Sequence, residues 1–289
     1  MASRVVVRVV RHVPGLDRLG RWVADVTDAF YRRARPLQSL LTGTWLGHPI
    51  HPMITGVAIG AWTVVAAFDA IGIAVPSAGL SGAAAVALWL GVAAAAVSVL
   101  SGLTDFKDTY GLEQRVGILH ALVMACVTIL FLASGIVRLS GPVDSLAGRA
   151  LGFIGFGLMM VGGFLGGEMT FAFGSMVDHN AFREPLDDFV TIGPVSDLNE
   201  GLNYAEADGR PVLLVRHAEL VTGIGEVCSH AGGPLHEGTL RGDEVTCPWH
   251  GSRFRTADGS VGRGPAPFPQ ARYEVRVVAG KVQVRSWVG

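Results

Sequence analysis

The sequence has few charged residues. Only 16% of its 289 residues are Asp, Glu, Lys or Arg, whereas 50% are apolar, and soluble globular domains average about 25% charged residues. The deficit is uneven, because residues 70–104 contain no charged residue while residues 190–289 contain ten Lys or Arg and eleven Asp or Glu. This distribution excludes a single soluble domain and a disordered chain, and it predicts a membrane-embedded part followed by a domain of ordinary composition.

Cysteine and excess basic charge are also lacking. The three cysteines, Cys126, Cys228 and Cys247, are too few for the disulfide framework of a small secreted domain, although they suffice for a metal site. The formal net charge is −1, which gives no support to nucleic-acid binding, because such proteins usually carry a clear basic excess.

The first 47 residues form a basic segment with eight Arg and three Asp, and they lack the apolar core of a signal peptide. Apolar residues recur at helical spacing between Leu16 and Phe30. This pattern predicts an amphipathic helix. The sequence allows two positions for this helix, on an anionic membrane surface or packed against the protein itself.

Four stretches of low charge follow, at about residues 52–75, 81–104, 116–137 and 147–170. Each is long enough to cross a hydrocarbon core of ~30 Å, which takes roughly 20 apolar residues. Residues 150–167 of the fourth stretch contain seven glycines and two overlapping G-x-x-x-G pairs, a pattern that allows helices to approach closely in lipid. We therefore expect a four-helix transmembrane domain over residues 48–180, surrounded by the lipid bilayer.

Arginine distribution predicts how this domain is oriented. Four spans place both termini on one side of the membrane, and the Arg-rich amino-terminal segment makes that side the cytoplasm by the positive-inside rule. The expected location is the plasma (inner) membrane, as a multi-pass protein with its amino and carboxyl termini in the cytoplasm.

Beyond a linker at residues 181–189, the pattern changes to short β-rich runs separated by turn dipeptides such as Asp208-Gly209 and Asp258-Gly259. Residues 190–289 are therefore predicted to form a small all-β domain. The fold class expected for the whole chain is α + β in two domains, a four-helix transmembrane bundle followed by this β domain.

Two Cys/His pairs lie in the β domain, Cys228-Ser-His230 and Cys247-Pro-Trp-His250. Two loops that each offer a thiolate and an imidazole can hold one inorganic centre. The four residues suit either a single zinc ion or a [2Fe–2S] cluster with both cysteines on one iron and both histidines on the other.

The residues around these pairs favour the second alternative. The chain resembles the Rieske iron–sulfur family through Cys228-Ser-His-Ala-Gly-Gly-Pro-Leu235, Cys247-Pro-Trp-His-Gly-Ser-Arg-Phe254 and Gly264-Pro-Ala-Pro267. The resemblance implies that residues 190–289 are a Rieske domain with a [2Fe–2S] cluster. The implied cluster ligands are Cys228, His230, Cys247 and His250, and the implied surrounding residues are Gly232, Gly233, Gly251, Ser252 and Pro265.

The chain departs from the high-potential members of that family at two positions. Those proteins carry one further cysteine in each loop, joined as a disulfide, where this chain has Gly233 and Trp249. The resemblance therefore implies the lower-potential, ferredoxin-like type, which suits a reducing cytoplasm.

Four further histidines, His48, His51, His120 and His179, are predicted near the cytoplasmic ends of the spans. Ionisable groups at such positions are often functional, and helices of a bundle can supply paired axial ligands to haem. The four are candidates for a haem b or metal site, with His51 and His120 as the favoured pair. Hydrogen bonding at helix ends and a quinone site are the alternatives.

The membrane half also resembles an uncharacterised bacterial membrane-protein family, one of the numbered domains of unknown function. The resemblance covers about residues 40–180 and rests on the motifs 47–52 and 102–105, on Arg115 with His120, and on 162–168. It implies no activity.

The function expected from these features is a membrane-anchored Rieske electron-transfer protein that exchanges single electrons with a soluble or membrane partner. The partner protein is not identified, and no residue is expected to be catalytic. A component of a membrane-bound oxidoreductase or oxygenase is one alternative, although only 39 residues follow His250. A redox sensor is the other.

Overall fold

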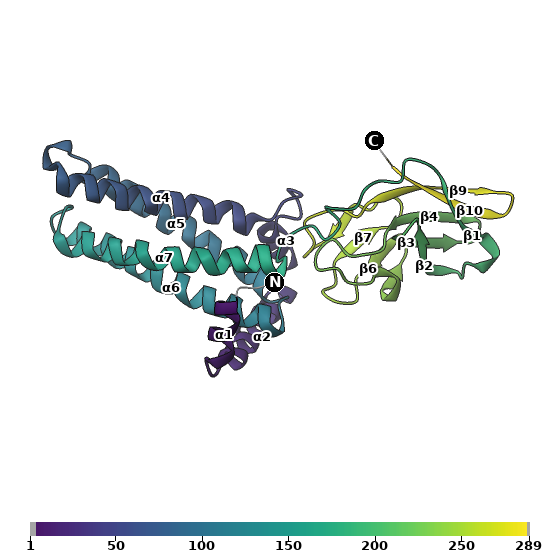
Figure 1. Cartoon of the computed structure of the whole chain (residues 1–289), viewed down its shortest axis with the longest axis horizontal. Coiled ribbons are helices and arrows are strands. Elements are labelled where there is room, and N and C mark those ends of the chain that lie inside the picture. Colours follow the sequence, from purple (N-terminus) through teal and green to yellow (C-terminus); the bar gives the residue numbers. More distant parts are fainter. Residues whose placement is uncertain (1–3, 288–289) are drawn as a thin grey trace. The chain divides into compact units, whose positions relative to one another are not determined.

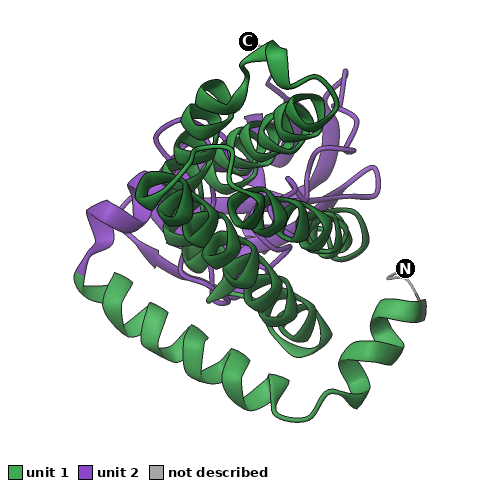
Figure 2. Ribbon diagram, turned by 90° about the vertical axis from the view of Figure 1, so that its left-hand side faces the viewer, with its two compact units in different colours: residues 1–33, 50–174 green, residues 34–49, 175–289 purple. Residues whose placement is uncertain are grey.

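The computed structural model describes residues 4–287 of the chain, and its fold is the expected combination of helices followed by β-strands. The chain divides into two compact units. One comprises residues 1–33 and 50–174, and the other comprises residues 34–49 and 175–289 (Figure 2).

Helices occupy the amino-terminal half of the described chain (Figure 1). They are α1 (Arg4–His12), α2 (Leu16–Arg33), α3 (Arg35–Thr42), α4 (Ile50–Ala74), α5 (Ser81–Phe106), α6 (Gly111–Ser140) and α7 (Leu146–Phe173), with a 3₁₀ turn, η1 (Pro76–Ala78), between α4 and α5.

The four long helices α4 to α7 have the properties of membrane spans. They contain 25 to 30 residues each. In the most apolar 18-residue stretch of each helix, only 28–33% is buried inside the protein. Most of their apolar surface therefore faces outward. Since exposing so much apolar surface to water is costly, these helices are stable in lipid, and the chain is a membrane protein.

Large apolar side chains fill the centre of this bundle. Trp62 of α4 stacks on Phe131 of α6, with ring centroids 4.3 Å apart and planes within 4° of parallel. Glycines on the other two helices make room for both rings. A Cβ atom at Gly91 of α5 would lie 2.3 Å from the Trp62 ring, and one at Gly155 of α7 would lie 3.0 Å from the Phe131 ring.

Helices α1 and α2 belong to the same unit. Leu16 and Ala24 are buried in a cluster with Val116 of α6, whereas Trp22 and Phe30 on another face of α2 are exposed. One face of the amphipathic helix therefore packs on the protein itself, and the face with the large aromatic residues is left exposed.

The second unit is built on two antiparallel sheets (Figure 1). The six-stranded sheet has the order β1-β10-β9-β4-β3-β2, and the four-stranded sheet has the order β5-β6-β7-β8. The strands are β1 (Val190–Pro194), β2 (Gly201–Ala207), β3 (Arg210–His217), β4 (Leu220–Gly225), β5 (Thr239–Arg241), β6 (Glu244–Thr246), β7 (Arg253–Arg255), β8 (Val261–Arg263), β9 (Arg272–Val278) and β10 (Lys281–Ser286), with 3₁₀ turns η2 (Val195–Asp197) and η3 (Leu235–Glu237).

Strand β3 shows why two cores form. Its residues 212–215 are all buried, and because side chains alternate along a strand, Val212 and Leu214 enter one apolar cluster while Leu213 and Val215 enter another. The second cluster also contains Cys228 and the side chains that underlie the small sheet. The candidate metal loops are therefore attached to a rigid apolar core.

Candidate metal centre

The first Cys/His loop follows β4 and is closed by backbone hydrogen bonds. The N–H of Cys228 donates to the Gly233 carbonyl at 2.9 Å, and the N–H of Gly232 donates to the Cys228 carbonyl at 2.8 Å. Gly232 has φ = +80°, a conformation that favours glycine because it carries no Cβ. The chain thereby folds into a tight turn around Cys228.

The second Cys/His loop, between β6 and β7, repeats the same pattern. The N–H of Cys247 donates to the Ser252 carbonyl at 2.8 Å, and the N–H of Gly251 donates to the Cys247 carbonyl at 3.1 Å. Gly251 has φ = +74°. The two loops are therefore equivalent turns, each presenting one cysteine and one histidine.

The two thiol groups lie within hydrogen-bonding reach of each other. A hydrogen bond from Cys228 lowers the pKa of Cys247 to about 7, and the same interaction raises the pKa of Cys228. Backbone N–H groups of His230 and Ala231 point at the Cys228 sulfur. Those of Trp249 and His250 point at the Cys247 sulfur. Such groups of N–H donors stabilise negative charge on sulfur, so both loops are suited to thiolate ligands.

The two histidines lie edge to face, with ring centroids 5.0 Å apart and planes at 85°. His230 is only 8% exposed, and the Nδ1 atoms of both rings are shielded from solvent. A Cβ atom at Gly233 would lie 2.9 Å from the Cys247 sulfur, so glycine is required there for the two loops to approach.

This donor set fits a two-iron cluster better than a single zinc ion. Within residues 4–287, no three His, Cys, Asp or Glu side chains converge on one ion position, whereas a structural zinc site needs four ligands around one point. Two thiols in contact with each other and two neighbouring imidazoles match the ligation of a [2Fe–2S] centre by two cysteines and two histidines.

The loop between β8 and β9 contacts both the second Cys/His loop and the segment 34–49. The buried hydroxyl of Ser252 accepts a hydrogen bond from the N–H of Ala266 at 3.0 Å. Thr44 donates from Oγ1 to the Ala266 carbonyl at 3.3 Å. A Cβ atom at Gly264, beside Pro265, would lie 2.4 Å from the Thr44 hydroxyl. Sequence patterns do not predict the contact between Thr44 and Ala266, because it joins residues more than 200 positions apart.

The four other candidate histidines are divided between the two units, two in each. His48 is exposed in the segment 34–49, and its Nδ1 lies 2.9 Å from the Pro49 carbonyl. His179 lies in the second unit, where its backbone N–H donates to the Ser229 carbonyl in the first Cys/His loop at 3.3 Å. His51 and His120 belong to the helical unit, on α4 and α6.

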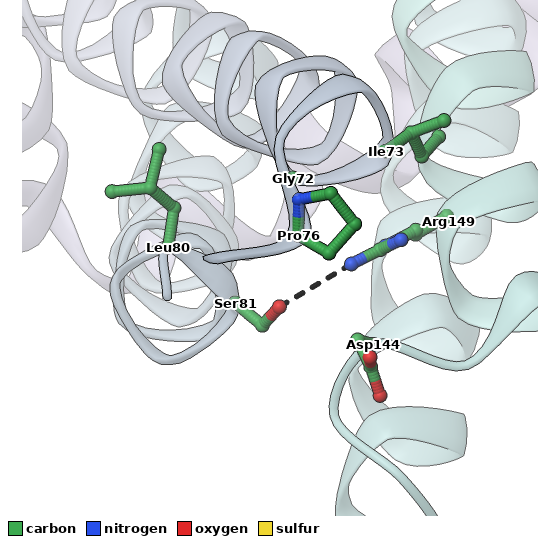
Figure 3. Close-up of a pocket in the computed structure, with 7 residues that line it drawn as sticks. All are labelled: Gly72, Ile73, Pro76, Leu80, Ser81, Asp144 and Arg149. Atoms are coloured by element: carbon green, nitrogen blue, oxygen red, sulfur yellow. Dashed lines mark hydrogen bonds between the residues drawn. The ribbon is translucent and has the colours of Figure 1, made fainter. Parts of the chain in front are cut away.

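The bundle also contains a small pocket, of about 260 Å³, at the turn between α4 and α5. Figure 3 shows Arg149 reaching across it to Ser81, whose hydroxyl lies 3.3 Å from the guanidinium. None of the candidate ligands lines this pocket.

Comparison with known proteins gives two family matches. Residues 47–179 match the family described as "Predicted membrane protein (DUF2231)", and residues 188–276 match the Rieske [2Fe-2S] domain.

Several curated proteins resemble the second region. The cytochrome b6-f complex iron-sulfur subunit of Chlorobaculum tepidum is 33% identical over 97 residues, which are 33% of this chain and 52% of that protein. The ferredoxin CarAc of Metapseudomonas resinovorans is 34% identical over 74 residues, which are 26% of this chain and 69% of the ferredoxin. The chain thus spans about half the length of the first relative.

A solved structure, the ferredoxin of carbazole 1,9a-dioxygenase from Nocardioides aromaticivorans, is 28% identical, with a TM-score of 0.32; the match covers 36% of this chain and 98% of that one. The two Cys/His loops lie within residues 188–276, the region that matches the Rieske domain. The chain belongs to the Rieske [2Fe-2S] domain family, and its Rieske domain follows a membrane domain of the DUF2231 family.

Proposed function

We propose that this protein is a membrane-anchored one-electron carrier, in which Cys228, His230, Cys247 and His250 hold a [2Fe–2S] cluster on the cytoplasmic side. The observation that carries the proposal is the pair of equivalent Cys/His turns, each with backbone N–H groups aimed at its cysteine sulfur. When bound, the cluster supplies a centre that gains and loses a single electron, at a potential raised by its two neutral histidine ligands.

The backbone N–H groups of the two loops and the side chains around them have different roles. The N–H groups around each cysteine hold negative charge on the sulfurs. His230 is buried, whereas His250 is partly exposed and adjoins Trp249, whose side chain is 49% exposed. The surface at Trp249 and His250 is therefore the proposed docking face for the redox partner, which we expect to be a protein. Aromatic residues are enriched at such interfaces.

An electron carrier fits this chain better than an oxygenase. An oxygenase also needs a mononuclear iron, usually held by two histidines and a carboxylate. In the part of the chain that the structure describes, no three such side chains meet at one ion position. A redox sensor remains the second candidate, and it differs in requiring a change in the membrane domain when the cluster is reduced.

The proposal is tested by electron paramagnetic resonance of the full-length protein in membranes after reduction with dithionite. We expect two iron atoms and two acid-labile sulfides per chain, and a signal with the low average g value of mixed histidine and cysteine ligation. The Cys247→Ser variant should lose this signal. The matched control is Cys126→Ser, a cysteine on the exposed surface of α6, which should retain it fully. Stoichiometric zinc without iron would refute the proposal.

A further inference from the structure

The helical unit contains two equivalent hairpins, α4–α5 and α6–α7. Contacts between α4 and α6 occur at a constant offset of 69 residues. Trp62 stacks on Phe131, and the buried Asp69 accepts a hydrogen bond from Arg138 Nη1 at 3.0 Å. Because both pairs share one offset, α4 and α6 run in parallel in a single register across the core.

His51 and His120 have this same offset. His51 precedes Trp62 by eleven residues, and His120 precedes Phe131 by eleven. Eleven residues make about three turns of an α-helix, so each histidine lies on the same face of its helix as the stacked ring. The register therefore directs the two imidazoles toward each other across the core. They are close enough to interact electrostatically.

The two histidines make equivalent hydrogen bonds. Nδ1 of His51 lies 2.9 Å from the carbonyl oxygen of Ser98 on α5. Nδ1 of His120 lies 2.9 Å from the carbonyl oxygen of Gly162 on α7. A carbonyl can only accept, so Nδ1 carries the proton in each neutral ring. The lone pair is then on Nε2, the arrangement typical of histidines that bind metal.

Glycines allow both rings to lie close to the neighbouring helices. A Cβ atom at Gly102 would lie 2.8 Å from Cε1 of His51, and one at Gly166 would lie 3.1 Å from Cε1 of His120. Each glycine follows the corresponding carbonyl acceptor by four residues. Ring, hydrogen bond and glycine are thus repeated in both hairpins, which is more than a chance pair of histidines at helix ends would show.

The number of ligands selects the metal. Among the described residues no third His, Cys, Asp or Glu joins these two in an ion site, and protein zinc sites use three or four protein ligands. Haem supplies four nitrogens of its own and needs only two axial ligands, which facing helices of a bundle can provide. We propose that His51 and His120 are the axial ligands of a haem held between α4 and α6, which is a second one-electron site in the chain.

The test is a pyridine haemochrome assay on the full-length protein, purified in detergent from cells supplied with a haem precursor. We expect one haem b per chain and the absorption spectrum of a low-spin, six-coordinate iron. His51→Ala and His120→Ala should each lower the haem content at least tenfold. His48→Gln is the matched control, because His48 is three residues from His51 but exposed, and it should keep the full content.

A methionine variant separates ligation from folding. In His120→Met a thioether can replace the imidazole, so we expect haem to be retained with a higher midpoint potential, as methionine ligation gives. Cys247→Ser should lose the Rieske signal and keep the haem, so the two proposals fail independently. Purified protein without haem, or haem that survives both alanine substitutions, would overturn the assignment, as would stoichiometric zinc or copper bound in its place.

Discussion

Among single residues, Ser252 links the second Cys/His loop to the loop that contains Pro265. Its side chain is fully buried, and its oxygen accepts the N–H of Ala266 at 3.0 Å. Because the oxygen is an acceptor in this contact, the hydroxyl proton is available to another acceptor, and the resemblance to Rieske proteins implies a cluster sulfur. Hydrogen bonds to the sulfurs favour the reduced cluster, which carries more negative charge.

We therefore expect Ser252→Ala to lower the reduction potential of the cluster. A charge-assisted hydrogen bond contributes roughly 1.5–3 kcal/mol. Since 1.4 kcal/mol corresponds to about 59 mV for one electron, the expected decrease is about 60–130 mV. The measurement is a redox titration followed by electron paramagnetic resonance. Ser196→Ala, at an exposed serine, should leave the potential unchanged. An unchanged potential in Ser252→Ala would show that the hydroxyl does not reach the cluster.

Local spacing identified the four candidate ligands, because each Cys/His pair lies within four residues of sequence. The same reasoning could not place Thr44 beside Ala266, or His179 beside the first Cys/His loop. Both contacts join residues far apart in the chain, and neither leaves a local pattern. The four ligands and their surrounding glycines remain predictions until the cluster is measured.

At the scale of elements, glycines determine how closely the helices of the bundle approach. Gly91 of α5 faces the Trp62 ring, and an added Cβ would lie 2.3 Å from its Nε1 atom. Gly60 of α4 is exposed, and a Cβ there would meet nothing within 4 Å. Gly91 therefore makes room for a neighbouring side chain and Gly60 does not, although both lie in apolar helices.

We expect Gly91→Ala to destabilise the bundle by about 1–3 kcal/mol, the typical cost of overpacking a filled core. Thermal unfolding of the full-length protein in detergent should show a lower midpoint. Gly60→Ala should leave the midpoint unchanged or raise it slightly, since alanine favours helix. Equal effects of the two substitutions would contradict the packing described around Trp62.

Helix spans were predictable because about 20 consecutive residues of low charge are a long signal. The unit to which the segment 34–49 belongs was not predictable from the sequence. The sequence groups its first residues with the basic amino-terminal segment, whereas the structure places residues 34–49 with the β unit. Helix α3 has only eight residues, and so short an element is positioned by its tertiary contacts rather than by its own propensity.

At the scale of the whole molecule, charge is distributed unequally between the two ends of the helical bundle. The amino-terminal segment carries eight arginines, and the α5–α6 connection at the same end begins with Lys107. At the other end, Arg138 and Arg149 both lie close to the buried Asp69. The positive-inside rule counts Lys and Arg rather than net charge, and these two arginines are outnumbered by the eight of the amino-terminal segment.

This asymmetry predicts that the α4–α5 turn faces away from the cytoplasm and that the Rieske domain faces the cytoplasm. Single cysteines can be introduced into Cys126→Ala protein at Ser77, in the exposed η1 turn, or at Ser196, on the exposed surface of the β unit. A membrane-impermeant maleimide added to spheroplasts should label Ser77→Cys and not Ser196→Cys, and inverted vesicles should give the reverse. Labelling of Ser196→Cys in spheroplasts would place the Rieske domain outside the cell and restrict its redox partners to proteins on that side.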